Sequence, residues 1–538
     1  MNLRKLTSTS LAVIGMLQSF IPTAARAQAV ERPPQYVLLA FDGSYNNDVW
    51  ESSRAFSTKK KAQGVDVRFS YFINPVYLLW KCPAASTTCK PPPYTRSDYY
   101  NPPGYRSERD ASGKVIQVKN VGSAIGWGDN DKDISWRIEN MNNAFTEGHE
   151  IGSHAVGHFD GSSWSYEDWK SEFNQFYSIL DKVFEINKIS PTALYPQGLA
   201  FRNDIVGFRA PVLGFSPGMY QALPEFGLKY DTSQQDQPTY WPQMNKYGTW
   251  NFPLAGISRP GSARTTPSMD YNFCYVDSAA LLQTDPGLMS YKVPGEKANT
   301  NRECLNTVRP EQKVALKKNM MTMYMNYFNN NYYGNRAPVS IGHHFSRWVS
   351  GAYYETFFEF AEKVCGLPEV KCVTTKEYME FMNSTPNSVV QAYRSGAFAK
   401  LPRPKSSIAP KSLDLSAQVV VENNQLVLKT TGRDTALRGI NKSIYIGTTK
   451  IHADRISLSQ ARALAKPDSD LSIAIRGVVY NRQGEEIQSA THRLEKVGTA
   501  NEILSSESVE QKAIKGHMTE AHTNEVDFDE TNSETFGH

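Results

Sequence analysis

The sequence predicts an α/β fold over residues 30–400, built on a mostly parallel sheet or barrel, and a small all-β domain over residues 410–496. Short apolar runs alternate with helical patterns from about residue 35 to residue 385, which is the order of elements in parallel α/β folds. Polar residues with special chemistry recur where the apolar runs end, as on the loop face of such folds. The composition changes after the linker-like segment 401–405.

The first strand is expected at residues 35–41, a nearly continuous apolar run of the kind that is buried on both faces. It ends at Asp42, ahead of a turn-rich segment. A second strand is expected within residues 65–74. Residues 75–130 are rich in Pro, Tyr, Gly and Asn, and we interpret them as a long insertion.

The other elements of the first domain follow from hydrophobic periodicity and from cap residues. Ser165 begins a helix with a capping box, and Ser216 followed by Pro217 begins another. A second Pro- and Gly-rich excursion occupies residues 234–310. Strands are expected at 150–153, 230–233, 338–342 and 370–374, and helices at 133–146, 311–328, 351–365 and 375–382.

The C-terminal part is expected to contain short strands separated by turns, a pattern that favours a small β-sandwich. Residues 497–538 are polar, acidic and poor in apolar side chains, so this tail is expected to be disordered. The expected strands of the β-domain lie at residues 419–421, 425–428, 443–446, 471–475 and 478–480.

The N-terminus indicates export. Residues 1–27 combine a basic start, a short apolar run and a small-residue cleavage pattern, which together predict a secretory signal peptide and a periplasmic or extracellular protein. The apolar run is too short to span a bilayer, and no other stretch qualifies as a transmembrane segment. Six cysteines fit an oxidising compartment. Proximity suggests the disulfides Cys82–Cys89, Cys274–Cys304 and Cys365–Cys372, while other pairings stay open.

Two histidines, His154 and His158, stand four residues apart directly after the expected strand at 150–153. Neutral imidazole is the commonest metal ligand in proteins, and open zinc sites use three protein ligands and a water. Taken alone, the pair is equally compatible with two surface or core histidines near a loop that bind no metal. Other strand ends also carry residues suited to catalysis, namely Asp42, Arg209, Asp231 and His344.

Four motifs occur in a fixed order between about residue 35 and residue 385: Phe41-Asp42, Ser153-His154-Ala155-Val156-Gly157-His158, Phe208-Arg209-Ala210-Pro211 and Ile341-Gly342-His343-His344. This series resembles the polysaccharide deacetylases (carbohydrate esterase family four, NodB homology domain), in particular their secreted chitin-deacetylase-like branch. The resemblance implies an irregular (β/α) barrel. It also implies a hydrolase that removes N-acetyl groups from a GlcNAc-containing glycan.

The resemblance implies a divalent metal, usually zinc, bound by an Asp and two His. His154 and His158 fall on the two metal histidines. Asp42 falls on the general base that takes a proton from the metal-activated water, and Arg209 falls on the arginine that holds this base.

The general acid of the family is a histidine, and it maps to His344, with the neighbouring His343 as the alternative. An aspartate orients this acid in the family. Asp231 and Asp270 are both expected candidates for that role.

The first motif departs from the family pattern Phe-Asp-Asp, whose second Asp binds the metal, because Gly43 follows Asp42. Either Asp42 has moved to the metal and another group is the base, or Asp42 stays the base and the metal is held by two His with water or a distant carboxylate. A third alternative is a catalytically impaired glycan-binding protein on the same barrel. The candidates for a distant carboxylate are Asp129, Asp131 and Asp160.

The expected partner is a polysaccharide, and peptidoglycan, chitin-like polymers and exopolysaccharide all stay open. A net charge of +4 with no long basic run gives no reason to expect nucleic-acid binding. We expect the two insertions, 75–130 and 234–310, to shape the cleft.

Overall fold

The computed structural model describes most of the first domain and parts of the C-terminal region. The predicted signal peptide and the predicted Cys82–Cys89 pair lie outside the described residues. The other two pairs, Cys274–Cys304 and Cys365–Cys372, are confirmed as disulfides. No helix in the described part of the chain is long and apolar enough to cross a membrane. The described ranges are 30–80, 98–259, 265–403, 413–432, 437–446, 449–451, 455–464, 470–480, 486–499 and 512–518.

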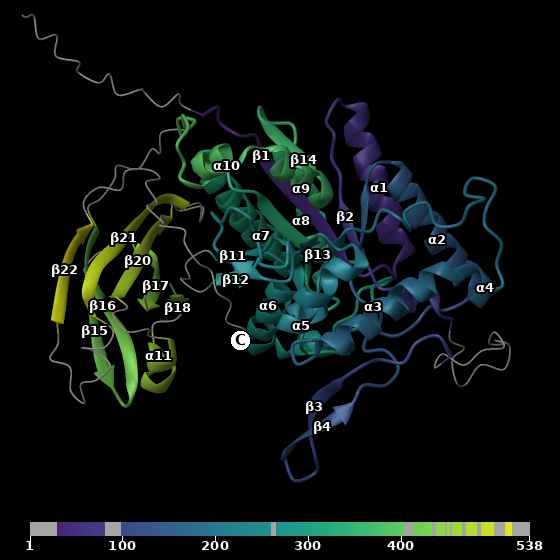
Figure 1. The fold of residues 1–538 in the computed structure, drawn as a ribbon, viewed down its shortest axis with the longest axis horizontal. Coiled ribbons are helices and arrows are strands. Elements are labelled where there is room, and N and C mark those ends of the chain that lie inside the picture. Colours follow the sequence, from purple (N-terminus) through teal and green to yellow (C-terminus); the bar gives the residue numbers. More distant parts are fainter. Residues whose placement is uncertain are drawn as a thin grey trace, which may run out of the picture.

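A curled sheet of nine strands forms the centre of the first domain (Figure 1). Its pairings are parallel except for the last, between β10 and β9, which confirms the predicted α/β class. β14 (Val370–Val373) pairs with the amino-terminal half of β1. The order of the remaining strands is β13 (Val339–His344), β1 (Gln35–Asp42), β2 (Ser70–Ile73), β5 (Glu150–Ser153), β6 (Gly207–Phe208), β7 (Tyr230–Asp231), β10 (Trp250–Asn251) and β9 (Gln243–Met244).

The excursion at 234–310 supplies three further strands, β8 (Gln235–Asp236), β11 (Leu254–Ser258) and β12 (Thr265–Pro267). They lie beside β13, because the backbone N–H of Gly342 donates to the Ser268 carbonyl over 2.9 Å. The Ser268 hydroxyl donates to the Ser340 carbonyl over 2.6 Å. The excursion therefore extends the curl of the main sheet past β13.

The two faces of β1 belong to two different cores, because side chains alternate along a strand. Odd-numbered residues from Val37 to Phe41 pack into the large core that the helices cover. Even-numbered residues from Tyr36 to Ala40 pack into a second core inside the curl. Asp42 continues the even series and so lies on the concave side, at the carboxyl end of the strand.

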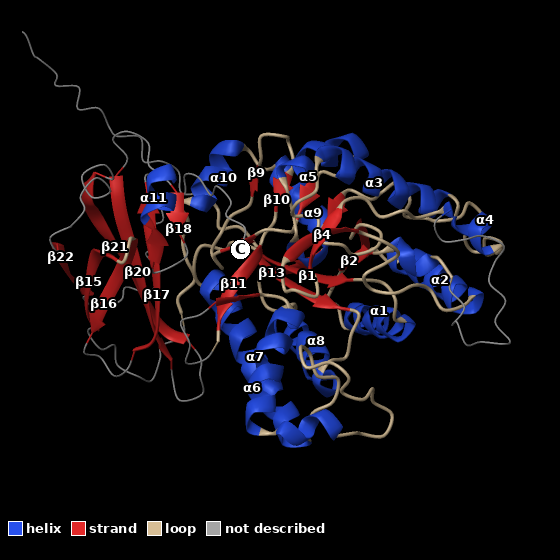
Figure 2. Cartoon of the chain, turned by 90° about the horizontal axis from the view of Figure 1, so that it is seen from below, coloured by secondary structure: helices blue, strands red, loops and turns tan. Residues whose placement is uncertain are grey.

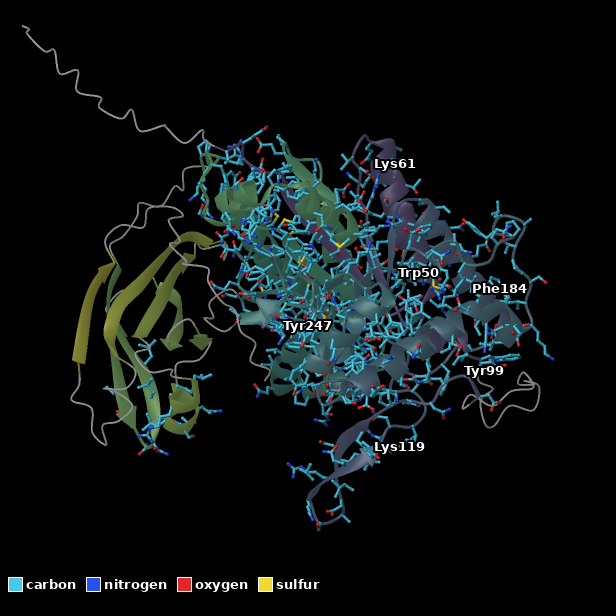
Figure 3. All side chains as sticks on the ribbon, viewed as in Figure 1. Trp50, Lys61, Tyr99, Lys119, Phe184 and Tyr247 are labelled. Atoms are coloured by element: carbon cyan, nitrogen blue, oxygen red, sulfur yellow. A yellow bond between two sulfur atoms is a disulfide. The ribbon has the colours of Figure 1, made fainter. Side chains whose placement is uncertain are left out.

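Helices surround the sheet (Figure 2). Trp50 of α1, labelled in Figure 3, is fully buried against the sheet. Helix α1 was not predicted, because its buried side chains are mostly polar or small and its last turn is a run of lysines. The helices are α1 (Asn47–Ala62), α2 (Asp131–Thr146), α3 (Tyr166–Asp181), α4 (Val183–Asn187), α5 (Pro217–Ala222), α6 (Asp270–Thr284), α7 (Pro310–Tyr332), α8 (Ala352–Val364), α9 (Thr375–Ser384) and α10 (Asn387–Arg394).

The described part of the insertion at 75–130 contains a hairpin of β3 (Tyr105–Arg109) and β4 (Val115–Lys119), which projects from the domain in Figure 1. The segments on both sides of the hairpin return to the domain. Tyr100 is buried, and the backbone N–H of Ala124 donates to the Gly157 carbonyl over 2.9 Å. The insertion is therefore attached to the loop that carries His154 and His158.

The C-terminal region forms two four-stranded antiparallel sheets, as the predicted β-domain requires. The predicted disordered tail needs correction where it overlaps strands, because β21 extends to Thr499 and β22 pairs with β15. Backbone pairing along an open strand edge does not require the apolar composition on which the prediction rested. The elements are β15 (Leu413–Glu422), β16 (Gln425–Gly432), β17 (Leu437–Ile446), β18 (Thr449–Ile451), β19 (Arg455–Ser457), α11 (Leu458–Leu464), β20 (Asp470–Tyr480), β21 (Glu486–Thr499) and β22 (Lys512–Met518).

Candidate functional site

The carboxyl ends of the parallel strands bring four of the predicted residues to the concave side of the sheet. Asp42 and His344 are in register on β1 and β13, and both continue the inward-facing series of their strands. His154 follows β5 and Arg209 follows β6, one residue past Ser153 and Phe208, which are in register with each other. Strands far apart in the sequence thus place one carboxylate, one guanidinium and two imidazoles at the same edge.

Arg209 and Asp42 form a buried ion pair. The Nη1 atom of Arg209 donates to Oδ1 of Asp42 over 2.6 Å, and the two side chains are 1% and 2% exposed. The Nε atom of Arg209 donates to the Thr232 hydroxyl over 2.7 Å. Gly342 leaves the space for this arrangement, because a Cβ there would lie 3.0 Å from Nη1 of Arg209. The pair holds the Asp42 carboxylate in one orientation.

The His154 and His158 rings lie with their centroids 5.0 Å apart. The Nδ1 atom of His154 is 2.7 Å from the Arg209 carbonyl, which fixes the tautomer with the proton on Nδ1. The Nε2 atom of His154 is buried and has no hydrogen-bond partner. Burial lowers the pKa of both imidazoles to about 3, so both are neutral, the form that ligates metals.

The loop between these histidines is held by a buried carboxylate. Ala155 and His158 both adopt positive φ angles, of 54° and 61°, which non-glycine residues seldom do. The backbone N–H of Val156 donates to Oε1 of Glu172 on α3 over 2.7 Å. The Tyr100 hydroxyl donates to Oε2 of Glu172 over 3.2 Å and accepts from the backbone N–H of Gly157 over 3.1 Å. These contacts keep the loop in its strained conformation.

His344 is held by Asp270, the first residue of α6. The Nδ1 atom of His344 is 2.6 Å from Oδ1 of Asp270, and the backbone N–H of His344 donates to Oδ2 over 3.0 Å. Burial alone would lower the pKa of His344, but the carboxylates of Asp270 and Asp42 outweigh it and raise this pKa above 6.5. With Nδ1 on Asp270, the other ring nitrogen, Nε2, is the one left for a substrate.

The pleat turns the side chains of His343 and Asp231 to the outer face of the sheet, away from Asp42 and His344. The Nδ1 atom of His343 nevertheless lies 3.6 Å from Oδ2 of Asp270. The Nε2 atom of His343 is 2.8 Å from the Tyr324 hydroxyl of α7, and burial lowers the pKa of His343 to about 4. Asp231 accepts from the Tyr220 hydroxyl over 2.9 Å and from the Ser233 hydroxyl. Burial raises the pKa of Asp231 to about 6.

The donor set for a metal is incomplete. The unpartnered Nε2 of His154 and the neighbouring His158 fit two nitrogen ligands of a divalent cation. No group of three His, Cys, Asp or Glu in the described residues could hold a metal ion. Of the distant carboxylates, Asp129 accepts from the Tyr45 hydroxyl, Asp131 is exposed at the start of α2, and Asp160 accepts from the N–H of Ser162 over 2.9 Å.

Gly43 stands beside Asp42 with a φ of +87°, and nothing lies within 4 Å of where its Cβ would be. The backbone N–H of Gly43 donates to the Phe72 carbonyl over 2.9 Å, so the position is fixed by the sheet. The space next to Asp42 is therefore open, and no side chain of this residue fills it.

Three contributors to the site were missed by sequence reasoning. Thr232, which binds Arg209, and the Glu172–Tyr100 pair carry no motif of their own. Glu172 lies on the helical face that also buries Trp169 and Phe176, and a charged residue among apolar ones on a core-facing stripe is the signal that could have identified it.

No protein-family model matches the sequence, and no curated protein matches it. Among solved structures, a protein named as a candidate polysaccharide deacetylase from Mycobacterium smegmatis aligns over 70% of this chain and 100% of its own, at 11% identity and a TM-score of 0.31. The peptidoglycan deacetylase PdaC from Bacillus subtilis aligns over 65% of this chain and 92% of its own, at 10% identity and a TM-score of 0.28.

PdaA from Bacillus subtilis, a family 4 carbohydrate esterase, aligns over 66% of this chain and 86% of its own, at 11% identity and a TM-score of 0.27. At identities and TM-scores this low, the activity of the chain has to be argued from its own residues.

Proposed function

We propose that this protein is a metal-dependent hydrolase that removes N-acetyl groups from a GlcNAc-containing polysaccharide. The observation that carries the proposal is that two hydrogen-bonded pairs, a carboxylate with a guanidinium and an imidazole with a carboxylate, meet at one edge of the sheet. Asp42 is held by Arg209, and His344 is held by Asp270. A fixed carboxylate and a fixed imidazole of raised pKa are the base and the acid that amide hydrolysis needs.

His154 and His158 would hold the metal, zinc in our proposal, with water completing the coordination. When bound, such a metal lowers the pKa of a coordinated water and polarises the amide carbonyl. The Arg209 carbonyl supports this role, because it fixes the His154 tautomer that carries its proton on Nδ1 and leaves Nε2 for a metal. Asp42 stays the base in this proposal, since its ion pair with Arg209 holds the carboxylate toward the site.

The proton movements follow from the two pairs. Asp42 accepts a proton from the attacking water, and Arg209 keeps the carboxylate oriented for that transfer. His344 gives a proton from Nε2 to the amine nitrogen as it leaves, while Asp270 stabilises the charged imidazole through Nδ1. Free amine and acetate are the products.

We further propose that the protein works outside the cytoplasm, in the periplasm or beyond the cell. Disulfides Cys274–Cys304 and Cys365–Cys372 fit an oxidising compartment. Peptidoglycan, chitin-like polymers and exopolysaccharide are the candidate substrates.

A second candidate function is a glycan-binding protein without catalysis. Gly43 favours it, because this residue leaves the metal with two histidine ligands from the described residues. Acetate release distinguishes the two functions, because only the hydrolase produces acetate.

The experiment is acetate release from GlcNAc oligomers, peptidoglycan and an acetylated exopolysaccharide by the zinc-loaded full chain. His154→Ala, which removes the unpartnered Nε2, is the matched variant. We expect release by the wild type and none by the variant. Binding of a glycan without release by the zinc-loaded wild type would select the second function, and neither binding nor release would contradict both.

A further inference from the structure

The hairpin of β3 and β4 is uncovered on both faces and at both edges. Its strands pair with each other and with no third strand of the described part of the chain, and no side chain of either strand is buried. The hairpin projects from the domain in Figure 1, and Lys119 at its base is labelled in Figure 3. A two-stranded hairpin alone in water is at best marginally stable, so a further strand would stabilise it.

The base of the hairpin is fixed to the domain. Gly104, directly before β3, packs against Trp164 so closely that no side chain would fit there. The Nδ2 atom of Asn120, directly after β4, donates to the Pro103 carbonyl over 2.9 Å. A strand edge that is already held in place loses little conformational freedom when it pairs, which favours association.

The free backbone groups of β3 follow from the hydrogen bonds at the two ends of the hairpin. The N–H of Asn120 donates to the Gly104 carbonyl over 3.1 Å, and the N–H of Asp110 donates to the Lys114 carbonyl over 2.9 Å. Hydrogen-bonded residues alternate along an antiparallel pair. The even-numbered residues of β3 therefore bond to β4, and its odd-numbered residues direct their N–H and C=O groups outward.

The outer edges of the two strands are not equivalent. On β4, Lys119 belongs to the outward series, and its carbonyl already accepts from Nη1 of Arg106 over 3.2 Å. On β3, the outward groups of the odd-numbered residues face no described strand. The edge of β3 is therefore the more complete template for a new strand.

The side chains of β3 are arranged symmetrically about Ser107. Arg106 and Glu108 flank it on one face, where Nη2 of Arg106 lies 2.6 Å from Oε1 of Glu108. Tyr105 and Arg109 come next and lie on the other face with Ser107, because side chains alternate along a strand. Reading β3 in the opposite direction therefore exchanges a base for an acid at each flanking position.

We propose that β3 pairs with β3 of a second copy of this chain, antiparallel about Ser107, so that two hairpins form one four-stranded sheet. In this register Ser107 forms a hydrogen-bonded pair with its counterpart, and Tyr105 does so with Arg109 of the second copy. These pairs use the outward backbone groups. The pairing has two-fold symmetry, the commonest symmetry of homodimers.

The charges of β3 select this register over its neighbours. Arg106 lies opposite Glu108 of the second copy, and Glu108 lies opposite Arg106, so two attractive pairs form. The two adjacent antiparallel registers that use the same backbone groups are centred on Arg106 or on Glu108. Each of them places like charges directly opposite one another, which destabilises a strand pair.

The first test is sedimentation velocity of the full chain over a concentration series. Arg106→Glu puts two carboxylates opposite one another in the dimer, and Glu108→Arg puts two guanidinium groups there. Each variant should raise the dimer dissociation constant about tenfold or more. An equimolar mixture of the two variants restores opposite charges at both pairs and should dimerise as tightly as the wild type. Lys114→Glu makes the same charge change in the turn of the hairpin, and this control should leave dimerisation unchanged.

The second test is disulfide formation between copies of Ser107→Cys under mild oxidation. The Cα atoms of a hydrogen-bonded antiparallel pair are about 5.5 Å apart, which a disulfide can span. Gln117→Cys is the matched control, because Gln117 lies directly opposite Ser107 on β4. We expect a covalent dimer of Ser107→Cys on a non-reducing gel and none of Gln117→Cys.

A wild type that stays monomeric over the whole series would overturn the proposal. So would a mixture of Arg106→Glu and Glu108→Arg that dimerises no better than either variant alone. Faster linkage of Gln117→Cys than of Ser107→Cys would place the contact on β4 and contradict the pairing of β3. These measurements need neither zinc nor acetate release, so their outcome is independent of the proposed function.

Discussion

Arg209 and Asp42 are each other's buried charge partner, with Nη1 and Oδ1 2.6 Å apart at the carboxyl edge of the sheet. Strands β6 and β1 place them there, with β2 and β5 between. The pair links the position of the proposed base to the loop after β6, whose carbonyl at Arg209 also fixes His154. One residue therefore organises both the carboxylate and the first imidazole.

Arg209→Met should destabilise the protein strongly, because it leaves the Asp42 carboxylate buried without a partner. We expect the free energy of unfolding at pH 7 to fall by about 3–5 kcal/mol. The double variant Arg209→Met/Asp42→Asn should recover part of this loss, since it removes the unpaired charge. Urea denaturation of the two variants measures the difference, and a double variant less stable than the single one would contradict the account.

Asp270→Asn should move the alkaline limb of the rate profile to lower pH. The acid must be protonated, so activity falls as pH rises through the pKa of His344, which Asp270 and Asp42 raise. Removing the Asp270 charge lowers that pKa. The measurement is kcat for acetate release against pH.

Asp231→Asn is the control for this profile. Its carboxylate faces Tyr220 and Ser233 on the outer side of the sheet, so the alkaline limb should stay where it is in the wild type. If the alkaline limb moved in Asp231→Asn and stayed in place in Asp270→Asn, Asp231 and not Asp270 would be the aspartate that orients the acid.

Gly43→Asp should strengthen zinc binding, because it adds a carboxylate to a two-histidine donor set in an open space. We expect affinity to rise about tenfold or more, measured by competition with a chromophoric chelator. The φ of +87° strains any side chain at this position. Gly43→Asn is therefore the matched control, and an equal gain in both variants would contradict the explanation.

Glu172→Gln should flatten the dependence of stability on pH. Burial raises the pKa of Glu172 to about 7 from an ordinary 4.5. The folded protein thus keeps a proton that the unfolded chain has lost, and the free energy of unfolding falls as pH rises from about 4.5 to about 7. The glutamine still accepts from Val156 and carries no charge.

We expect the melting temperature of Glu172→Gln to increase relative to that of the wild type as pH rises from 5 to 8. Glu167→Gln, at an exposed position in the first turn of the same helix, controls for the loss of charge. A gap between wild type and Glu172→Gln that stays constant with pH would show that Glu172 is ionised throughout the range.

The sequence predicts the strands that carry the site. The alternation of side chains within those strands also indicates which of His343 and His344 faces the site. In 339–344 the apolar Val339 and Ile341 set the outward series, so His343 faces the helices and His344 the concave side. The same parity turns Asp231 outward, one residue from the inward Tyr230. The alternation of side chains therefore distinguishes His344 from His343 without any knowledge of the tertiary structure.

Other parts of the site depend on tertiary contacts that no local pattern contains. The approach of Asp270 to His344 needs the excursion at 234–310 to fold against β13, through Ser268. The strained loop at Ala155 and His158 depends on Glu172 and Tyr100, which come from a helix and an insertion. Such contacts are visible only once the chain is folded.

In our proposal, His154 and His158 hold the metal, and Asp42 is the base that takes a proton from the attacking water. Zinc content and acetate release, measured on the same samples of wild type and Asp42→Asn, test it most directly. We expect Asp42→Asn to bind as much zinc as the wild type and to release no acetate from GlcNAc oligomers. Loss of zinc from Asp42→Asn would make Asp42 a metal ligand, and acetate release at the wild-type rate would contradict its role as base.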